Sequence, residues 1–209
     1  VDGADLEDHF DTLAEALAAA KDGDTIKLVA GEYAESVTIS VSNLTIIGPN
    51  AGVNPNAEER VSEAVIKGVW TISTSASNLT INGLAFTGDA KITAGQIQGV
   101  KFLNNYVHDT TAPADAWAES NAYKSGFFYA ASSNSTLSTD LQFFNNRFEN
   151  VADDNINLAY VDNVSFDGNV FKNFGYDAIR FNNGYNGGVL AFTNNEFVQD
   201  TLGGYNGIF

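Results

Sequence analysis

The sequence predicts an all-β solenoid, a right-handed parallel β-helix with an N-terminal capping α-helix. Three observations support this prediction: apolar residues have helical spacing only near the N-terminus, a motif centred on phenylalanine recurs downstream, and Asn or Gly closes each short apolar run. The 209 residues, 44% of them hydrophobic, are enough for one core. We therefore divide the chain into a capping segment, residues 1–24, and one repeat domain, residues 25–209, which we expect to belong to a larger protein.

The predicted helix lies between Asp8 and Gly23. Apolar residues recur there with the spacing of one helix face: Phe10, Leu13, Ala14, Leu17 and Ala18. Asp8 or Asp11 is placed to cap the first turn, and Gly23 with Asp24 ends the helix. Such a helix would cover the first coil, whose apolar interior and strand edge would otherwise be exposed.

The rest of the chain consists of short strands and repeats. Runs rich in Val, Ile, Thr and Phe come first, at residues 25–29, 36–39, 44–47 and 79–81. Copies of a motif resembling Phe-x-Asn-Asn-x-Phe follow, at residues 100–107, 141–148, 164–171 and 190–197. A second motif recurs between them and at the end, at residues 126–129, 155–158, 178–181 and 207–209. The smallest interval between the shared phenylalanines is 23 residues, which predicts a coil of about 22 residues.

Each coil should place similar residues at equivalent interior positions. We expect one stacked aromatic column, made of Phe102, Phe143, Phe166 and Phe192. A second column should contain Ile156 and Ile179. One turn position should carry a hydrogen-bonded amide ladder, made of Asn105, Asn146, Asn169 and Asn195. The longer intervals imply insertions at one corner, at residues 49–63, 110–123, 131–139 and 182–188.

Charge and composition exclude several classes of partner. The chain has 26 acidic and 10 basic residues, a net charge of −16, so nucleic acid and anionic membrane surfaces would repel it. No apolar run approaches the roughly 20 residues of a membrane span, and we expect no membrane insertion. The absence of cysteine excludes disulfides and zinc–thiolate sites, and it is compatible with an extracellular location.

The repeats resemble the bacterial β-helix repeats of the pectin-lyase-like superfamily. The opening motifs at residues 12–17, 22–28 and 30–33 resemble that superfamily as well. The resemblance covers nearly the whole chain and is specific for the fold, but not for an activity. It implies that the leading helix is the cap over the open N-terminal end of the coil stack.

The second motif predicts a cluster of charged residues. If its inward side chains are Phe127, Ile156, Ile179 and Ile208, the outward ones are Phe128, Asn157, Arg180 and Phe209. Stacked coils would then bring together Lys124, Asp153, Asp154, Asp177 and Arg180. Two interpretations remain open: a solvated turn in which Arg180 pairs with Asp154 or Asp177, and a site for a hard cation such as calcium.

Polysaccharide lyases on this fold resemble this grouping. The resemblance implies that Asp153, Asp154 and Asp177 hold calcium, that Lys124 is the catalytic base, and that Arg180 pairs with a substrate carboxylate. A site for a polyuronate should gather several basic residues. After residue 101 the chain offers only Lys124, Arg147, Lys172 and Arg180.

Aromatic residues in the C-terminal half are candidate sugar contacts, because apolar sugar faces stack on aromatic rings. The candidates are Trp117, Phe128, Tyr129, Tyr160, Tyr176 and Tyr205. The competing interpretation is that most of them pack in the core or support the loops.

These observations favour a non-enzymatic, secreted or cell-surface β-helix module with a structural, adhesive or glycan-binding role and calcium as a candidate ligand. The alternative is a calcium-assisted polysaccharide lyase acting on an acidic glycan. The expected partners are a polysaccharide or another surface protein. Because residues 207–209 form a strand motif with no visible cap, we also expect a continuation of the parent protein, or self-association through the open C-terminal coil.

Overall fold

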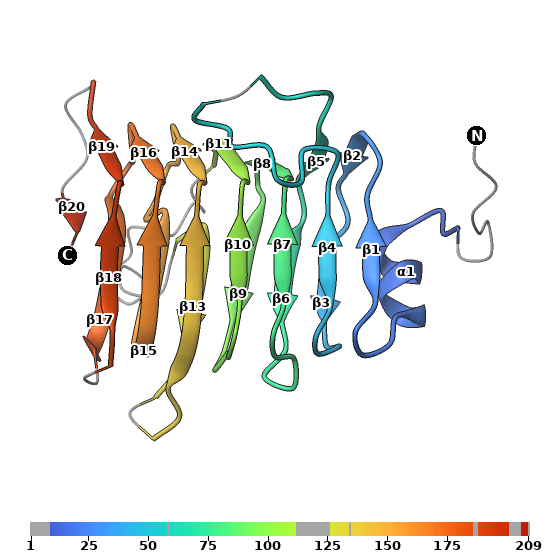
Figure 1. Ribbon diagram of the computed structural model, residues 1–209, viewed down its shortest axis with the longest axis horizontal. Coiled ribbons are helices and arrows are strands. Elements are labelled where there is room, and N and C mark those ends of the chain that lie inside the picture. The colour runs from blue at the N-terminus through green and yellow to red at the C-terminus, as the bar shows by residue number, and fades with distance from the viewer. Residues whose placement is uncertain are drawn as a thin grey trace.

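The protein is a parallel β-helix. The computed structural model describes residues 9–57, 59–111, 126–133, 135–185, 188–200 and 206–208. In these ranges the strands recur as seven coils, stacked along the long axis with the helix at the N-terminal end (Figure 1). All pairs between named strands are parallel, which confirms the predicted solenoid.

The coils have three faces, each built from one short strand per coil. The first face consists of β1 (Thr25–Lys27), β4 (Thr45–Ile47), β7 (Thr80–Asn82), β10 (Lys101–Leu103), β13 (Ser138–Phe144), the end of β15 (Ile156–Asp167) and β18 (Leu190–Thr193). The second face consists of β3 (Val37–Ile39), β6 (Val69–Ile72), β9 (Lys91–Ala94), β12 (Phe128–Ala131), the start of β15, β17 (Asp177–Tyr185) and β20 (Asn206–Ile208). Because β15 serves both faces, they form one 13-stranded sheet.

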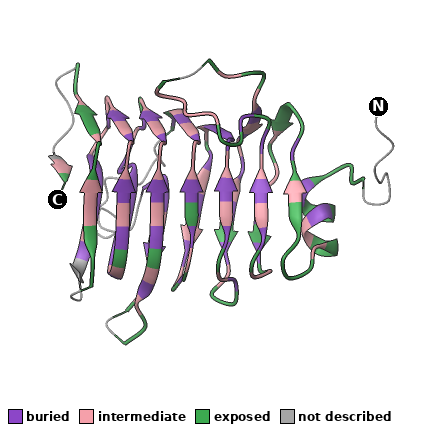
Figure 2. Ribbon diagram, viewed as in Figure 1, coloured by how far each residue is buried: buried purple, intermediate pink, exposed green. Residues whose placement is uncertain are grey.

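The third face is a separate seven-stranded sheet. It consists of β2 (Gly31–Tyr33), β5 (Ala64–Ile66), β8 (Ala85–Gly88), β11 (Tyr106–Thr110), β14 (Arg147–Glu149), β16 (Val170–Lys172) and β19 (Glu196–Val198). Buried residues alternate along the strands with partly exposed ones (Figure 2). This period of two is expected for strands with one face on the core.

The helix is shorter than the sequence suggested and has a different cap. It spans α1 (Leu13–Ala19), and Thr12, rather than Asp8 or Asp11, is the N-cap. The Thr12 side chain accepts a hydrogen bond from the Glu15 backbone, and the Glu15 side chain accepts one from the Thr12 backbone, which is a capping box. The Glu35 carboxylate accepts two further bonds from the backbone N–H groups of Leu13 and Ala14. These contacts anchor the helix start to the first coil, and Leu13 is buried.

The aromatic column lies where the repeat predicted it. Phe102 pairs in register with Phe143, Phe143 with Phe166, and Phe166 with Phe192. The ring centres of Phe143 and Phe166 are 5.1 Å apart and the ring planes are nearly parallel, at 8°, so the rings are stacked. Phe166 and Phe192 repeat this geometry at 4.9 Å and 4°. The second column is also confirmed, because Ile156 pairs with Ile179.

The asparagine ladder is confirmed as well. In each step the backbone N–H and the Nδ2 of one asparagine donate to the Oδ1 of the next, from Asn105 through Asn146 and Asn169 to Asn195. The left-handed backbone belongs to the residue before each ladder position, for example Asn104 at φ 52° and Asn145 at φ 54°. The ladder side chains therefore satisfy buried polar groups between coils, while their neighbours make the turn.

The insertion at residues 49–63 lies across one corner of the stack, at the top of Figure 1. Arg60 pairs with Glu63 through two contacts, of 2.6 and 3.0 Å, and donates 2.8 Å to the carbonyl of Asn104. Asn56 Nδ2 donates to the carbonyls of Asn146 and Gly168. The insertion therefore connects the second coil to turns of the fourth, fifth and sixth coils.

The last coil presents apolar side chains to solvent. Leu190 is 36% exposed, Phe197 37% and Ile208 46%. Among the described strands, β18 pairs only with β15, and β19 only with β16. An apolar coil with free strand edges is a template for association.

We therefore predict that this chain self-associates, as seen by sedimentation velocity over a range of concentrations. Ile208→Lys should suppress the oligomers, because it places a charge on the exposed apolar surface. A strictly monomeric parent chain at high concentration would contradict this prediction.

No helix among the described residues has the length and apolar character needed to cross a bilayer.

Candidate functional site

The second face carries the predicted charged cluster. On the outer side of this sheet the strands align Thr93 of β9, Tyr129 of β12, Asn157 of β15 and Arg180 of β17 in one row, in which Asn157 and Arg180 are buried. The turn that leads into β15 adds Asp153 and Asp154, and the first residue of β17 is Asp177. The topology therefore brings the described part of the predicted cluster together. Lys124 lies outside the described residues.

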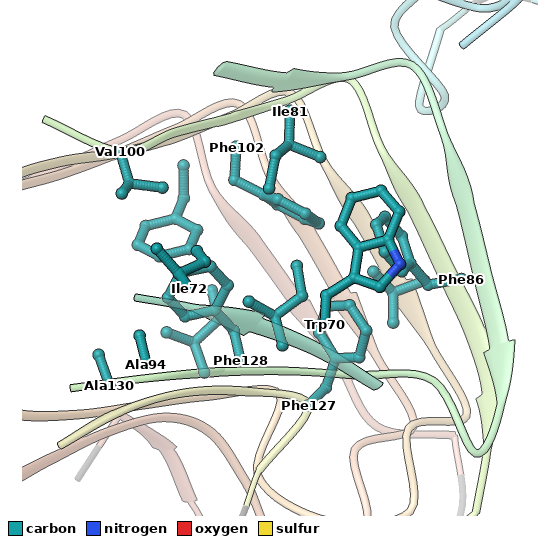
Figure 3. Packing of buried hydrophobic residues seen from close by; sticks show 14 of the residues in the cluster. Trp70, Ile72, Ile81, Phe86, Ala94, Val100, Phe102, Phe127, Phe128 and Ala130 are labelled. Carbon is teal, nitrogen blue, oxygen red and sulfur yellow. The ribbon is translucent and has the colours of Figure 1, made fainter. Parts of the chain in front are cut away.

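The register of β12 differs by one residue from the expectation. Phe128, and not Phe127, pairs with Ile156, so the predicted outward orientation of Phe128 is wrong. Phe128 is fully buried, with its ring 5.0 Å from that of Phe143. Phe127 also points into the core, because it lies in the turn just before the strand begins (Figure 3). Side chains alternate along a strand, so a shift of one residue exchanges its two faces.

Arg180 is held between two carboxylates. Its Nε lies 3.0 Å from Oδ2 of Asp154, and one terminal nitrogen donates to Oδ2 of Asp177 at 2.5 Å. Arg180 is 3% exposed, and both aspartates are fully buried. The Tyr176 ring centre lies 4.6 Å from the guanidinium carbon, a cation–π contact. In this conformation the guanidinium pairs with two carboxylates of its own chain, as in the solvated-turn interpretation, although the cluster is buried rather than solvated.

Amide groups complete the cluster. Asn157 Nδ2 donates 2.8 Å to Asp154, and Asn182 Nδ2 donates 2.6 Å to Asn157. Oδ1 of Asp154 accepts the backbone N–H of Asp177 at 3.0 Å, which joins two successive coils. Within the described residues, Oδ2 of Asp153 is buried and has no hydrogen-bond partner.

Among its described members, the cluster contains more buried carboxylates than cations. Burial raises the pKa of Asp154 from 3.8 to about 7, although the charge of Arg180 partly opposes this. Asp153 and Asp177 add to the rise through charge repulsion. Near neutral pH the Asp154 carboxyl is therefore protonated in a substantial part of the molecules.

We predict that this carboxyl makes stability depend on pH. Between about pH 4 and pH 7 the folded chain holds a proton on Asp154 that the unfolded chain releases, so stability falls as pH rises and levels off above pH 7. The contribution is on the order of 4 kcal/mol. Asp154→Asn should flatten the slope in urea unfolding across this range, whereas Asp11→Asn, at an exposed position, should not. Parallel slopes for the parent chain and Asp154→Asn would contradict the prediction.

The residues do not fit a calcium site in this conformation. Arg180 already occupies the position between Asp154 and Asp177 in which a cation would neutralise them. Across the described ranges, no three His, Cys, Asp or Glu side chains are grouped so that they could hold a metal ion. Calcium binding by Asp153, Asp154 and Asp177 therefore requires Arg180 to move.

The predicted aromatic contacts are spread over several environments. Tyr129, Tyr160 and Tyr176 are partly exposed, and burial raises the pKa of Tyr129. Trp117 and Tyr205 lie outside the described residues. Of the described candidates, Tyr129 shares the outward row with Arg180.

The third face carries a charged network that the repeat motifs did not predict. Glu149 accepts from Arg147 at 2.9 Å and from Lys172 at 3.3 Å, and the Tyr106 hydroxyl donates to it at 3.2 Å. The Tyr106 ring stacks on His108 at 4.3 Å. The common position of these residues in successive repeats could have predicted their proximity. Because Arg147 and Lys172 are paired with carboxylates, their charges are largely compensated.

No protein family and no curated protein matches the chain. Among solved structures, the chain is similar to a PL6 alginate lyase in complex with a trisaccharide, with 12% sequence identity and a TM-score of 0.30. The match covers 85% of this chain and 57% of that chain. A likeness of this size carries no argument about activity, so the fold rests on the strand register and membership of the pectin-lyase-like superfamily stays a prediction.

Proposed function

We propose that this chain is a non-enzymatic β-helix module of a secreted or cell-surface protein, with a glycan-binding role. The observation that supports the proposal is that the guanidinium of Arg180 is buried and paired within its own chain. An arginine that binds a substrate carboxylate must present its guanidinium to that carboxylate. Arg180 is buried and pairs with Asp154 and Asp177 instead.

Two further basic residues in the described part of the chain support the same proposal. Arg147 and Lys172 are paired through Glu149, on the third face and away from the row that contains Arg180. A lyase for an acidic glycan needs cations that neutralise the uronate and a base beside it. With a net charge of −16, the chain would also repel a polyuronate at long range.

The test is to incubate the chain with pectate, alginate and glycosaminoglycans, with and without calcium, and to follow the ultraviolet absorbance of unsaturated products. We expect no product and no calcium-dependent change in melting temperature. Product formation that requires calcium would overturn the proposal and support the lyase alternative. Binding is tested separately, by affinity electrophoresis in gels that contain soluble polysaccharides.

A further inference from the structure

The second face carries a row of hydroxyl groups that continues the row of Arg180 toward the N-terminus. Thr38 of β3, Thr71 of β6, Thr93 of β9 and Tyr129 of β12 are register partners from coil to coil. We call these four residues the hydroxyl row. Neighbouring strands are about 4.8 Å apart, so the row presents one hydroxyl group at each such step along the axis.

The hydroxyl row is accessible and uncharged. Thr38 and Thr71 are exposed, and Thr93 and Tyr129 are partly exposed. The hydroxyls of Thr71 and Thr93 lie 3.3 Å apart and are hydrogen-bonded to each other, so the two central residues form a connected pair of donors and acceptors. It ends at a tyrosine ring, which offers an apolar surface beside its hydroxyl.

We propose that the hydroxyl row binds a neutral polysaccharide that runs along the axis of the β-helix. This inference rests on the proposed glycan-binding role and names the class of glycan. Successive sugars of a β-1,4-linked chain advance by about the distance between coils, so each sugar can hydrogen-bond to one row residue. Tyr129 supplies a stacking surface for an apolar sugar face.

Charge selects a neutral glycan over an acidic one. None of the four row residues is charged, and Arg180, the cation in the described continuation of the row, is already paired with Asp154 and Asp177. Among the described residues of β9, Lys91 lies two residues before Thr93 on the same side of the strand and is a single cation beside the row. An acidic chain would therefore meet one cation for several carboxylates, while the net charge of −16 would repel it. A neutral chain avoids this repulsion.

The test compares two matched double variants. Thr71→Val with Thr93→Val removes two central hydroxyls of the row and keeps the β-branched shape that strands favour. Thr45→Val with Thr80→Val is the control, because these two threonines are also register partners, partly exposed, but lie on the first face. Circular dichroism checks that both variants fold.

Calorimetry measures binding. The neutral ligands are cellohexaose, xylohexaose and mannohexaose, and the acidic ones are alginate and galacturonate oligomers of equal length. We expect a neutral hexasaccharide to bind and each lost hydroxyl to weaken binding about threefold to tenfold, with the control variant unchanged. Binding of acidic oligomers only, or neutral binding that the row variant leaves unchanged, would overturn the inference and leave the glycan-binding role standing. No binding to any of these sugars would overturn both.

Discussion

Replacing Arg180 by Met should destabilise the chain by about 3–5 kcal/mol at about pH 8, because the change leaves Asp154 and Asp177 buried without their cation. Arg180 is 3% exposed and contacts both carboxylates, at 3.0 and 2.5 Å. Removing one partner of a buried ion pair costs more than the pair contributes, since desolvated charge remains. Urea unfolding followed by circular dichroism measures the change.

The loss should depend on pH in a defined direction. The charge of Arg180 opposes the rise in the pKa of Asp154, so without Arg180 this pKa rises further. At about pH 5 the Asp154 carboxyl therefore holds a proton and carries no unpaired charge. The destabilisation should therefore be smaller at about pH 5 than at about pH 8. Combining Arg180→Met with Asp177→Asn should recover part of the stability at the higher pH.

Arg147→Met is the matched control. Arg147 pairs with Glu149 at 2.9 Å, but its side chain is 27% exposed, and such pairs contribute about 1 kcal/mol or less. If Arg180→Met and Arg147→Met lost equal free energy of unfolding at both pH values, the prediction that burial makes the Arg180 ion pairs more important for stability would be wrong.

Phe143→Ala should cost about 3–5 kcal/mol, as expected for deleting a large buried aromatic side chain. Phe143 is 1% exposed, stacks on Phe166 at 5.1 Å and meets the edge of Phe128 at 5.0 Å. The cavity would lie in the fifth coil, between coils on both sides, so neighbouring rings cannot collapse into it without breaking the strand register. The midpoint and slope of urea unfolding measure the loss.

The neighbouring Phe144 provides a close control. It lies in the same strand but points outward and is partly exposed. Phe144→Ala should therefore change stability by about 1 kcal/mol or less. If the two alanine variants unfold at the same urea concentration, the inward assignment of Phe143 is wrong.

Much of the fold could be predicted because it follows from the spacing of apolar residues and of repeated motifs along the sequence. The helical spacing from Phe10 to Ala18 predicted a helix, although only the capping box of Thr12 and Glu15 decided where it begins. The recurrence of phenylalanine placed Phe102, Phe143 and Phe166 in one column. In a solenoid each coil repeats the same local structure, so the intervals between motifs in the sequence determine which residues are stacked.

The candidate site could be predicted only in part. Repeat alignment brought Asp154, Asp177 and Arg180 together, as the structure has them. It could not show that these groups are buried and paired, because burial depends on chain segments far away in the sequence. The hydroxyl row was missed, since Thr38, Thr71 and Thr93 lie in early coils whose sequences have diverged from the repeat.

The sequence by itself determined the solenoid, its columns and its amide ladder, because these follow from spacing along the chain. The tertiary structure alone decided the register of β12, where two adjacent phenylalanines offer two alignments that differ by one residue. The interior has room for both rings, since Phe127 lies in the turn and Phe128 begins the strand. That packing placed Tyr129, and not Phe128, on the outer side of the sheet, in register with Thr93 and Asn157.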